Sequence, residues 1–316
     1  MPTQLNVLIY NPDWTETYVT LLRKRAPELR LLACESEKDV TQSISKADIL
    51  FVSTRFPTHL IPQDSHIRWI QAMGAGVERF TNDKQLDRDI VLTRVSAGYG
   101  EKISEFVIAY LLLLSQRMQT VLRNQQCKLW EPLAISWLYG ETLGVAGVGQ
   151  IGRAIASKAQ AFDMRVIGFD IASSSDAPIE KMYGPDQLVE FAAEPRFMSI
   201  NMPLTQSTKG LFDRAVFDAM RTDSVLINTS RGGLVNEQDL IQALRQGSIG
   251  GAILDVFEEE PLPATSPLWE MPNVVVAPHH SGPSVPAEMV DFFLVNLDRW
   301  RSGSPLRGAV DREKGF

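Results

Sequence analysis

Cysteine is scarce in this chain and forms no recognisable cluster. Only Cys34 and Cys127 occur, which is too few for the disulfide framework of a small secreted protein. The two cysteines also lack the spacing of a structural metal site, so no bound metal is expected. The sequence therefore predicts a protein of the reducing cytoplasm.

Positive charge is in deficit as well. The chain has 31 Lys and Arg residues against 38 Asp and Glu residues, for a formal net charge of -7. Proteins that bind a phosphate backbone or an anionic membrane usually carry basic runs or a cationic face, and neither is visible here. Nucleic acid and membrane are therefore not expected as partners.

Long apolar runs are absent. The longest, residues 106–114, is far shorter than the ~18 residues that a membrane-spanning helix needs. It reads as a buried helix. The N-terminus has neither the basic start nor the long apolar stretch of a signal peptide, so the sequence predicts neither export nor membrane insertion.

The chain does contain short apolar segments separated by polar or helix-like stretches. The first series consists of residues 5–10, 29–33, 49–53, 69–72 and 90–95. Strands that alternate with helices are typical of βαβ units, which build parallel sheets covered by helices. The sequence therefore predicts a first α/β domain.

A second series of six apolar segments follows, and six strands suit a dinucleotide-binding fold. These segments are residues 143–146, 165–169, 197–202, 225–228, 252–256 and 274–277, with helical patterns at 151–162 and 237–245. One long helix over residues 101–119 is predicted to join the two series, and another over 287–300 to follow the last strand. At 316 residues the chain accommodates two domains of about 100–200 residues each.

A glycine-rich turn follows the first strand of the second series. Residues 147–152 read Gly-Val-Gly-Gln-Ile-Gly and run into an apolar-periodic stretch. In this pattern Gly147 permits a tight turn, Gly149 lets the backbone approach a pyrophosphate, and Gly152 allows close packing of strand and helix. The N–H groups of Gln150 and Ile151 would then meet phosphate. Glycines also serve ordinary turns, but the flanking strand and helix favour a dinucleotide site.

An acidic residue, Asp170, ends the next predicted strand. A carboxylate at this place accepts hydrogen bonds from the adenosine ribose and repels a 2′-phosphate. No arginine occurs in residues 171–175, just downstream. We therefore predict NAD rather than NADP as the cofactor, with a merely solvated strand-end aspartate as the structural alternative.

Three polar segments at predicted strand ends carry the remaining candidates, which are Arg231, Glu260 and His279. Ligands of open α/β sheets bind beyond the carboxyl ends of the strands, so these side chains can converge. Reduction of a 2-keto acid needs a cation for the carboxylate, a proton donor for the carbonyl oxygen and a group that keeps the donor protonated. Arginine, histidine and glutamate supply these in that order. Taken singly, each has a structural alternative as a surface ion pair, a backbone anchor or a solvated side chain.

In this order, behind this turn, the three segments resemble those of the D-isomer-specific 2-hydroxyacid dehydrogenases. Residues 73–78 (Met-Gly-Ala-Gly-Val-Glu), the segment around Pro203 and the closing residues 310–316 also match that family, so the resemblance covers most of the chain. It implies that Arg231, Glu260 and His279 are catalytic. Glu260 is preferred over the two glutamates before it because the family's carboxylate directly precedes a proline. Within the family, the sequence is most similar to glyoxylate and hydroxypyruvate reductases.

The resemblance also implies an architecture. The expected fold class is α/β, with two flavodoxin-like or Rossmann-like domains, parallel sheets and an active site in the interdomain cleft. Residues 1–98 and 283–316 would form a substrate-binding domain, with a dinucleotide-binding domain of residues 99–282 inserted between them. Members of the family are usually homodimers joined largely through the dinucleotide domain.

Further contacts follow from the same resemblance. The backbone N–H groups of Ala75 and Gly76 would bind the substrate carboxylate together with Arg231. Thr229 and Asp255 would lie by the nicotinamide. The residues expected on the adenosine side are Met202, Pro203 and Thr208.

The sequence leaves several roles open. His280 stands directly beside the expected proton donor, where the family commonly has a small or aliphatic residue. Arg55 follows a predicted strand and either contacts substrate or lies on the surface. Trp130 and Trp137 either pack within the chain or reach an active site across a dimer.

A second function also stays open, because corepressors of this superfamily keep the fold and even the three catalytic residues. The alternative to an enzyme is therefore an NAD(H)-binding sensor or corepressor-like scaffold with little turnover.

Overall fold

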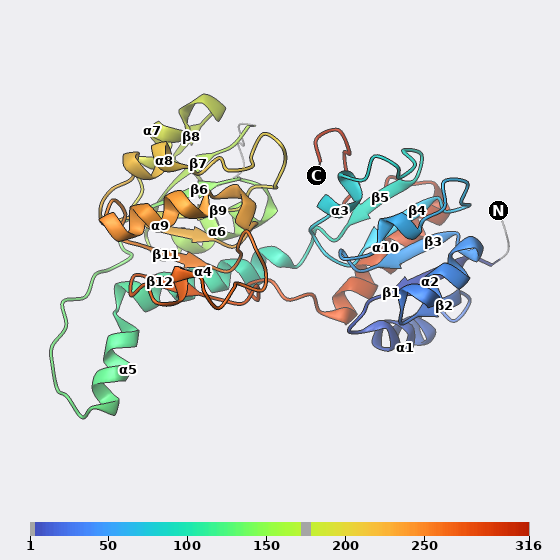
Figure 1. Ribbon diagram of the computed structural model, residues 1–316, viewed down its shortest axis with the longest axis horizontal. Helices are drawn as coiled ribbons and strands as arrows, with labels where there is room; N and C mark the ends of the chain where they lie inside the picture. The colour runs from blue at the N-terminus through green and yellow to red at the C-terminus, as the bar shows by residue number, and fades with distance from the viewer. Residues whose placement is uncertain (1–3, 172–177, 316) are drawn as a thin grey trace. The chain divides into compact units, whose positions relative to one another are not determined.

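The computed structural model describes residues 4–171 and 178–315. The chain divides into two compact units (Figure 1). The first unit comprises Met1–Gly98 and Ser284–Phe316, and the second comprises Tyr99–Pro283. The first unit therefore contains both ends of the chain, and the second is inserted into it.

The first unit is built on a five-stranded sheet in the order β2-β1-β3-β4-β5, and all of its strand pairs are parallel. The strands are β1 (Asn6–Tyr10), β2 (Arg30–Cys34), β3 (Ile49–Val52), β4 (Trp69–Ala72) and β5 (Val91–Arg94), and the helices are α1 (Thr15–Arg25), α2 (Glu37–Ser43), α3 (Glu78–Thr81) and α10 (Pro286–Ser302). Every residue of β3 and β4 is buried, as expected of parallel strands covered on both faces. The five strands predicted here are confirmed.

Helix α10 returns the C-terminal segment to the first unit's core (Figure 1). Its Phe293 stacks on Phe51 and on Trp69, with ring centroids 4.6 and 5.3 Å apart. The buried Asn296 amide donates to Gln71 Oε1 at 3.0 Å and to the Arg307 carbonyl at 2.9 Å. Apolar stacking and a satisfied buried polar network therefore both fix the return segment.

The second unit is built on a seven-stranded parallel sheet in the order β12-β11-β10-β9-β6-β7-β8. The strands are β6 (Thr142–Ala146), β7 (Arg165–Phe169), β8 (Lys181–Tyr183), β9 (Phe197–Ile200), β10 (Val225–Asn228), β11 (Gly251–Leu254) and β12 (Val274–Val276). The helices are α4 (Tyr99–Ser115), α5 (Met118–Gln126), α6 (Gln150–Gln160), α7 (Leu188–Ala192), α8 (Arg214–Ala219) and α9 (Glu237–Gln246). The predicted α/β class and both parallel sheets are thus confirmed.

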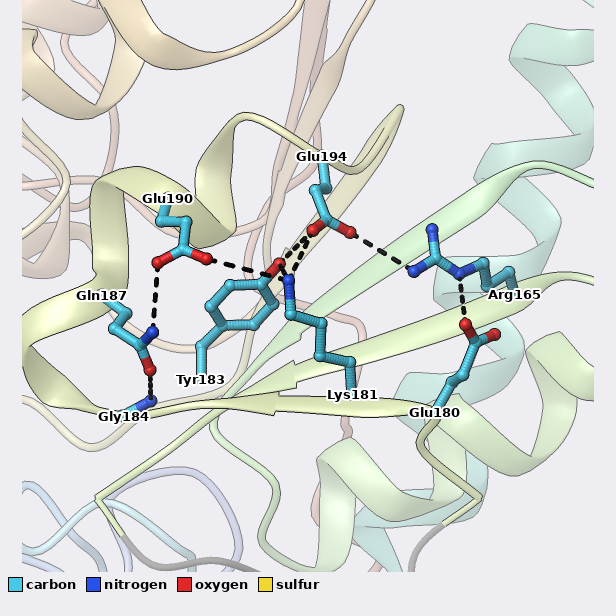
Figure 2. A network of polar contacts seen from close by, with 8 residues as sticks. All are labelled: Arg165, Glu180, Lys181, Tyr183, Gly184, Gln187, Glu190 and Glu194. Carbon is cyan, nitrogen blue, oxygen red and sulfur yellow. Dashed lines mark hydrogen bonds and ion pairs between the residues drawn. The ribbon is translucent and has the colours of Figure 1, made fainter.

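The prediction of six strands in the second series was wrong, because the described residues contain a seventh, β8. This edge strand has three residues, of which Tyr183 is buried against Phe191, and a network of polar contacts joins it to its neighbours (Figure 2). Lys181 and the Tyr183 hydroxyl both hydrogen-bond to Glu194, and Arg165 bridges Glu180 and Glu194. Lys181 holds the pKa of Glu194 below its usual range. A strand of three residues, only one of which is buried, is too short to show the apolar periodicity that predicts strands.

The single helix predicted over residues 101–119 was also wrong. Helix α4 ends at Ser115, and α5 begins at Met118 after Arg117, whose φ of 50° is left-handed. Figure 1 shows α5 extending away from the sheet of the second unit. The composition of α5 is helical throughout, so only the backbone at Arg117 separates it from α4, and a non-glycine residue in that conformation has no strong sequence signal.

No helix in the described ranges 4–171 and 178–315 is both long and apolar enough to span a membrane.

Candidate active site

The glycine-rich turn connects β6 to α6 with little space to spare on two sides. Gly147 has a φ of +92°, and a Cβ there would lie 2.7 Å from the Asn201 carbonyl oxygen. A Cβ on Gly152 would lie 2.1 Å from the Gly147 carbonyl oxygen. Around Gly149, by contrast, no described atom lies within 4 Å of a built Cβ. The turn is therefore closed toward the protein and open at Gly149, where a ligand can approach.

The open side of the turn coincides with the start of α6. Gly149 is the N-cap and supplies no side-chain cap. The N–H groups of Gln150, Ile151 and Gly152 have no acceptor within the helix, as in every first helical turn. Free donors and the positive end of an 11-residue helix form a site for an anionic group. The residues present therefore fit a pyrophosphate.

Asp170 directly follows β7, beside this turn. One carboxylate oxygen accepts the Val148 N–H at 2.6 Å and the other accepts the Ile171 N–H at 2.7 Å. The carboxylate is half-buried and is fixed to the glycine-rich turn itself. Of residues 171–175, in which the sequence has no arginine, residues 172–175 lie outside the described ranges.

Three other residues assigned to the dinucleotide follow β9 and β10. Thr208 fixes the loop after β9, because its hydroxyl donates to the Pro203 carbonyl at 2.7 Å. Met202 is buried, and its carbonyl accepts from Ser230 Oγ at 2.5 Å. The buried Thr229 hydroxyl has no hydrogen-bond partner in the described part of the chain. An orphaned buried hydroxyl at this strand end fits a polar group of a bound ligand.

His279 and Glu260 form a hydrogen-bonded pair, with 2.7 Å between His279 Nδ1 and Glu260 Oε2. The other carboxylate oxygen of Glu260 accepts the Phe257 N–H at 3.0 Å, which fixes its direction. The His279 side chain is 53% exposed and that of Glu260 is 35% exposed, so a ligand can reach the imidazole. Glu258, two residues earlier, instead accepts from the Glu237 N–H. Of the two, Glu260 is the one that contacts the histidine.

The backbone around His279 is held by Asp255, which is fully buried. Its two carboxylate oxygens accept the N–H groups of His280 and Ser281 at 2.8 and 2.9 Å. His279 itself has a left-handed φ of 52°, which is costly for a residue with a Cβ. Two charge-assisted hydrogen bonds immediately after it stabilise that conformation.

The neighbouring His280 points to a different partner. Its ring meets Phe106 of α4 edge-on, with ring centroids 5.7 Å apart. His279, and not His280, contacts Glu260. The two histidines therefore have separate environments.

Arg231 lies in the loop after β10, and this loop is packed against the segment that carries Glu260. The Asn228 side chain donates to the Arg231 carbonyl at 2.9 Å. A Cβ on Gly232 would lie 1.9 Å from the carbonyl carbon of Phe257. Glu237 hydrogen-bonds with Glu258 in the same segment, and burial together with the charges of Glu258 and Glu259 raises the pKa of Glu237. The two loops therefore keep a fixed spacing.

In the first unit, the sequence Met-Gly-Ala-Gly at residues 73–76 forms a turn after β4. The Gly74 carbonyl accepts the Val95 N–H at 3.0 Å, and the Ala75 carbonyl accepts from Arg94 Nη1 at 3.3 Å. Arg55, after β3, pairs with Asp13 at 2.5 Å, with both side chains largely exposed.

Comparison with known proteins shows the family of the chain. The profile of the family described as "D-isomer specific 2-hydroxyacid dehydrogenase, NAD binding domain" matches residues 108–281, more than half of the chain. A structure of a D-isomer specific 2-hydroxyacid dehydrogenase family protein from Aeromonas salmonicida subsp. salmonicida A449 is 34% identical, with a TM-score of 0.90 over 98% of this chain and 99% of that one. The chain belongs to the D-isomer specific 2-hydroxyacid dehydrogenase family.

Two further structures resemble this dehydrogenase along nearly its full length. An NADPH-dependent glyoxylate/hydroxypyruvate reductase from Sinorhizobium meliloti, in complex with NADP and sulfate, is 27% identical with a TM-score of 0.88, covering 99% of this chain and all of that one. A D-isomer specific 2-hydroxyacid dehydrogenase from Xanthobacter autotrophicus Py2, in complex with NADPH and MES, is 26% identical with a TM-score of 0.87, covering 98% and 99%. Membership makes this protein an NAD(P)-dependent 2-hydroxyacid dehydrogenase or reductase.

The two tryptophans before β6 are exposed in the dehydrogenase. Trp130 is 96% exposed and Trp137 is 63% exposed, so neither packs in a core of this chain. Leu129 and Tyr139 beside them are exposed too. Residues 118–139, which we term the arm, therefore present apolar side chains to their surroundings.

Some features of the dehydrogenase's site were not foreseen from sequence. The pattern singled out Arg55 as a cation at a strand end but passed over Arg94, which ends β5 in the same way. It also gave Gly232 no role beside Arg231. Both omissions concern contacts to backbone atoms far away in sequence, which a local pattern does not record.

Proposed function

We propose that this dehydrogenase reduces a small 2-keto acid of the glyoxylate or hydroxypyruvate class with NADH. The observation that carries the proposal is the 2.7 Å contact between His279 and Glu260, in the same unit as the glycine-rich turn. A carboxylate-paired imidazole is a suitable proton donor. The Sinorhizobium meliloti reductase, at 27% identity, supports this substrate class.

A bound nicotinamide dinucleotide would supply the hydride, and four groups of residues would hold it. The glycine-rich turn would bind the pyrophosphate through Gly147, Gly149, Gln150, Ile151 and Gly152. Asp170 would bind the adenosine ribose, Met202, Pro203 and Thr208 would contact the rest of the adenosine end, and Thr229 and Asp255 would lie by the nicotinamide.

On the substrate side, the guanidinium of Arg231 binds the carboxylate of the keto acid, for which its planar fork is suited. The N–H groups of Ala75 and Gly76 assist it. His279 protonates the carbonyl oxygen from Nε2, because Nδ1 is occupied by Glu260. The hydrogen bond to Glu260 fixes the orientation of the ring.

The main experiment follows NADH oxidation with glyoxylate, hydroxypyruvate, pyruvate and phenylpyruvate. We expect turnover with the smaller acids. His279→Ala should lower activity by about 100- to 10,000-fold, as for a lost acid–base group, and His280→Ala is the matched control that should stay near the native rate. Absence of turnover with every acid, despite NADH binding, would favour the NAD(H)-binding scaffold instead.

The role of Glu260 is tested by Glu260→Gln, which keeps shape and removes charge. The glutamine amide carries no charge, so the hydrogen bond from His279 Nδ1 to a charged group is lost. We expect kcat for glyoxylate reduction to fall by about 10-fold or more. An unchanged kcat in this variant would separate Glu260 from the proton transfer.

We further propose that the cofactor is NAD rather than NADP. The argument is electrostatic, since the Asp170 carboxylate would repel a 2′-phosphate, although two similar structures hold NADP or NADPH. Asp170→Asn keeps a side chain of the same shape, and we expect it to raise the efficiency with NADPH relative to NADH. A native preference for NADPH would refute the assignment.

The exposed arm supports a homodimer. Apolar patches of this kind mark interfaces, and an identical subunit is the partner we propose. Sedimentation should give about twice the mass of one chain, and Trp130→Ser with Leu122→Ser should weaken association.

The cytoplasmic location stays a prediction from cysteine content.

A further inference from the structure

The turn proposed to bind the substrate carboxylate is held from one side by the end of β5. The Gly74 carbonyl accepts the Val95 N–H at 3.0 Å, and the Ala75 carbonyl accepts from Arg94 Nη1 at 3.3 Å. In the described part of the chain, no hydrogen bond is found from the N–H groups of Ala75 and Gly76. The turn thus has anchored carbonyls and available donors.

These two facts are linked by the geometry of the peptide bond. In a planar trans peptide, the C=O of one residue and the N–H of the next point in opposite directions. Anchoring the Gly74 carbonyl toward β5 therefore directs the Ala75 N–H away from β5. Anchoring the Ala75 carbonyl toward Arg94 directs the Gly76 N–H away from Arg94 in the same manner.

The place of Arg94 is itself fixed by the C-terminal return. The Arg94 N–H donates to the Gly308 carbonyl at 2.9 Å. A Cβ on Gly308 would lie 2.1 Å from the Arg94 carbonyl oxygen, so the two backbones are in close contact. Arg94 is also paired with Ala72 in the register of β4 and β5, two residues before Gly74. The backbone from which the Arg94 side chain extends is therefore fixed on both sides.

We propose that Arg94 is a positioning residue for the substrate carboxylate. It holds the Ala75 carbonyl so that the Gly76 N–H is presented to the carboxylate of the keto acid. The proposal rests on the proposed function for the assignment of Ala75 and Gly76 to the substrate. Arg94 itself does not need to touch the substrate.

Arg94→Met tests this, because methionine keeps much of the apolar stem and removes the donor. The readout is the dissociation constant of oxamate, a carboxylate-bearing analogue of pyruvate, measured in the presence of saturating NADH. We expect oxamate to bind about 10- to 100-fold more weakly, the loss expected for a hydrogen bond to a charged group. The dissociation constant of NADH, whose proposed site is in the second unit, should stay within about twofold. Arg94→Lys keeps a cationic donor on a slightly shorter side chain and should recover part of the affinity.

The matched control is Arg30→Met, at the first residue of β2. It makes the same change of charge in the same unit, on an exposed side chain at the opposite edge of the sheet. It should leave oxamate binding unchanged. A loss equal to that of Arg94→Met would show a general effect of charge and overturn the proposal, as would an Arg94→Lys variant no better than Arg94→Met.

Amide hydrogen exchange separates this proposal from the proposed function. Loosening the turn should speed exchange at Val95, whose N–H donates to Gly74, in Arg94→Met but not in Arg30→Met. Native protein that neither binds oxamate nor oxidises NADH with any keto acid would refute the proposed function, while the exchange result would still decide whether Arg94 orders the turn. Unchanged exchange at Val95 would overturn the positioning role.

Discussion

Gly232 offers a sharp test of how the loop of Arg231 is coupled to the loop of Glu260. In Gly232→Ala the new Cβ would lie 1.9 Å from the carbonyl carbon of Phe257, 2.0 Å from its oxygen and 2.5 Å from the Glu258 nitrogen. Carbon atoms in contact are ordinarily about 3.5–4.0 Å apart. One of the two backbones must therefore move by more than ~1 Å, and no flexible side chain is available to absorb the change.

The expected magnitude follows from that displacement. A misplacement of about 1 Å at a reacting group can cost on the order of 100-fold in rate, so we expect kcat/KM with glyoxylate to fall by about that factor. Overpacking typically costs about 1–3 kcal/mol of stability, which leaves most small domains folded. Melting temperature and NADH binding, measured on the same preparation, report whether the variant has kept its fold.

Gly233→Ala is the matched control. A Cβ there meets only the Leu204 side chain, at 3.2 Å, which can shift by a few tenths of an ångström. This variant should keep kcat/KM within a few-fold of the native value, as conservative packing changes usually do. If Gly232→Ala were as active as Gly233→Ala, the spacing of the two loops would not matter for catalysis.

Three further outcomes are expected. Asp255→Asn replaces one acceptor of the His279 loop by an amide that faces a backbone N–H, and should lower kcat by about 10-fold or more; because Asp255 is also proposed to lie by the nicotinamide, NADH should bind more weakly, and a native kcat in this variant would refute the supporting role. Asn296→Leu removes the hydrogen bonds to Gln71 and Arg307, and urea unfolding should show about 2 kcal/mol or more of lost stability. Lys181 lowers the pKa of Glu194, so this pair stabilises the fold above the ordinary carboxyl range and loses its effect as pH falls through the lowered pKa. Glu194→Gln should therefore lower the melting temperature at pH 7, by an amount corresponding to no more than about 1 kcal/mol, and the difference should shrink as the pH falls below the ordinary carboxyl range.

The strands of both sheets could be predicted because burial on both faces makes a parallel strand nearly continuously apolar. All four residues of β3, β9 and β10 are buried, for example. The prediction failed where no run of buried apolar residues marks the element. Strand β8 has three residues at a sheet edge, of which only Tyr183 is buried, and the end of α4 depends on one left-handed residue, Arg117.

For the candidate site, the sequence predicted which residues belong to it but not every contact between them. Strand ends and glycine spacing identify which residues reach the carboxyl edge of a sheet, and on that basis Glu260 and His279 were placed in one group; the structure joins them at 2.7 Å. Choosing the proton donor between His279 and His280 required knowing which way each ring points. His279 contacts Glu260, whereas His280 contacts Phe106, which is distant in sequence.

The residues that sequence undervalued share one property, which is that their partners are backbone atoms. Asp255 binds the N–H groups of His280 and Ser281, and Arg94 binds the carbonyl of Ala75. A backbone partner has no residue-type signature, so no pairing of side-chain chemistries reveals the contact. Such contacts orient whole peptide groups, and peptide groups are the proposed donors to substrate and the support of the proposed acid. We infer that the precision of this site resides as much in charged side chains that hold the backbone as in the side chains expected to meet the ligand.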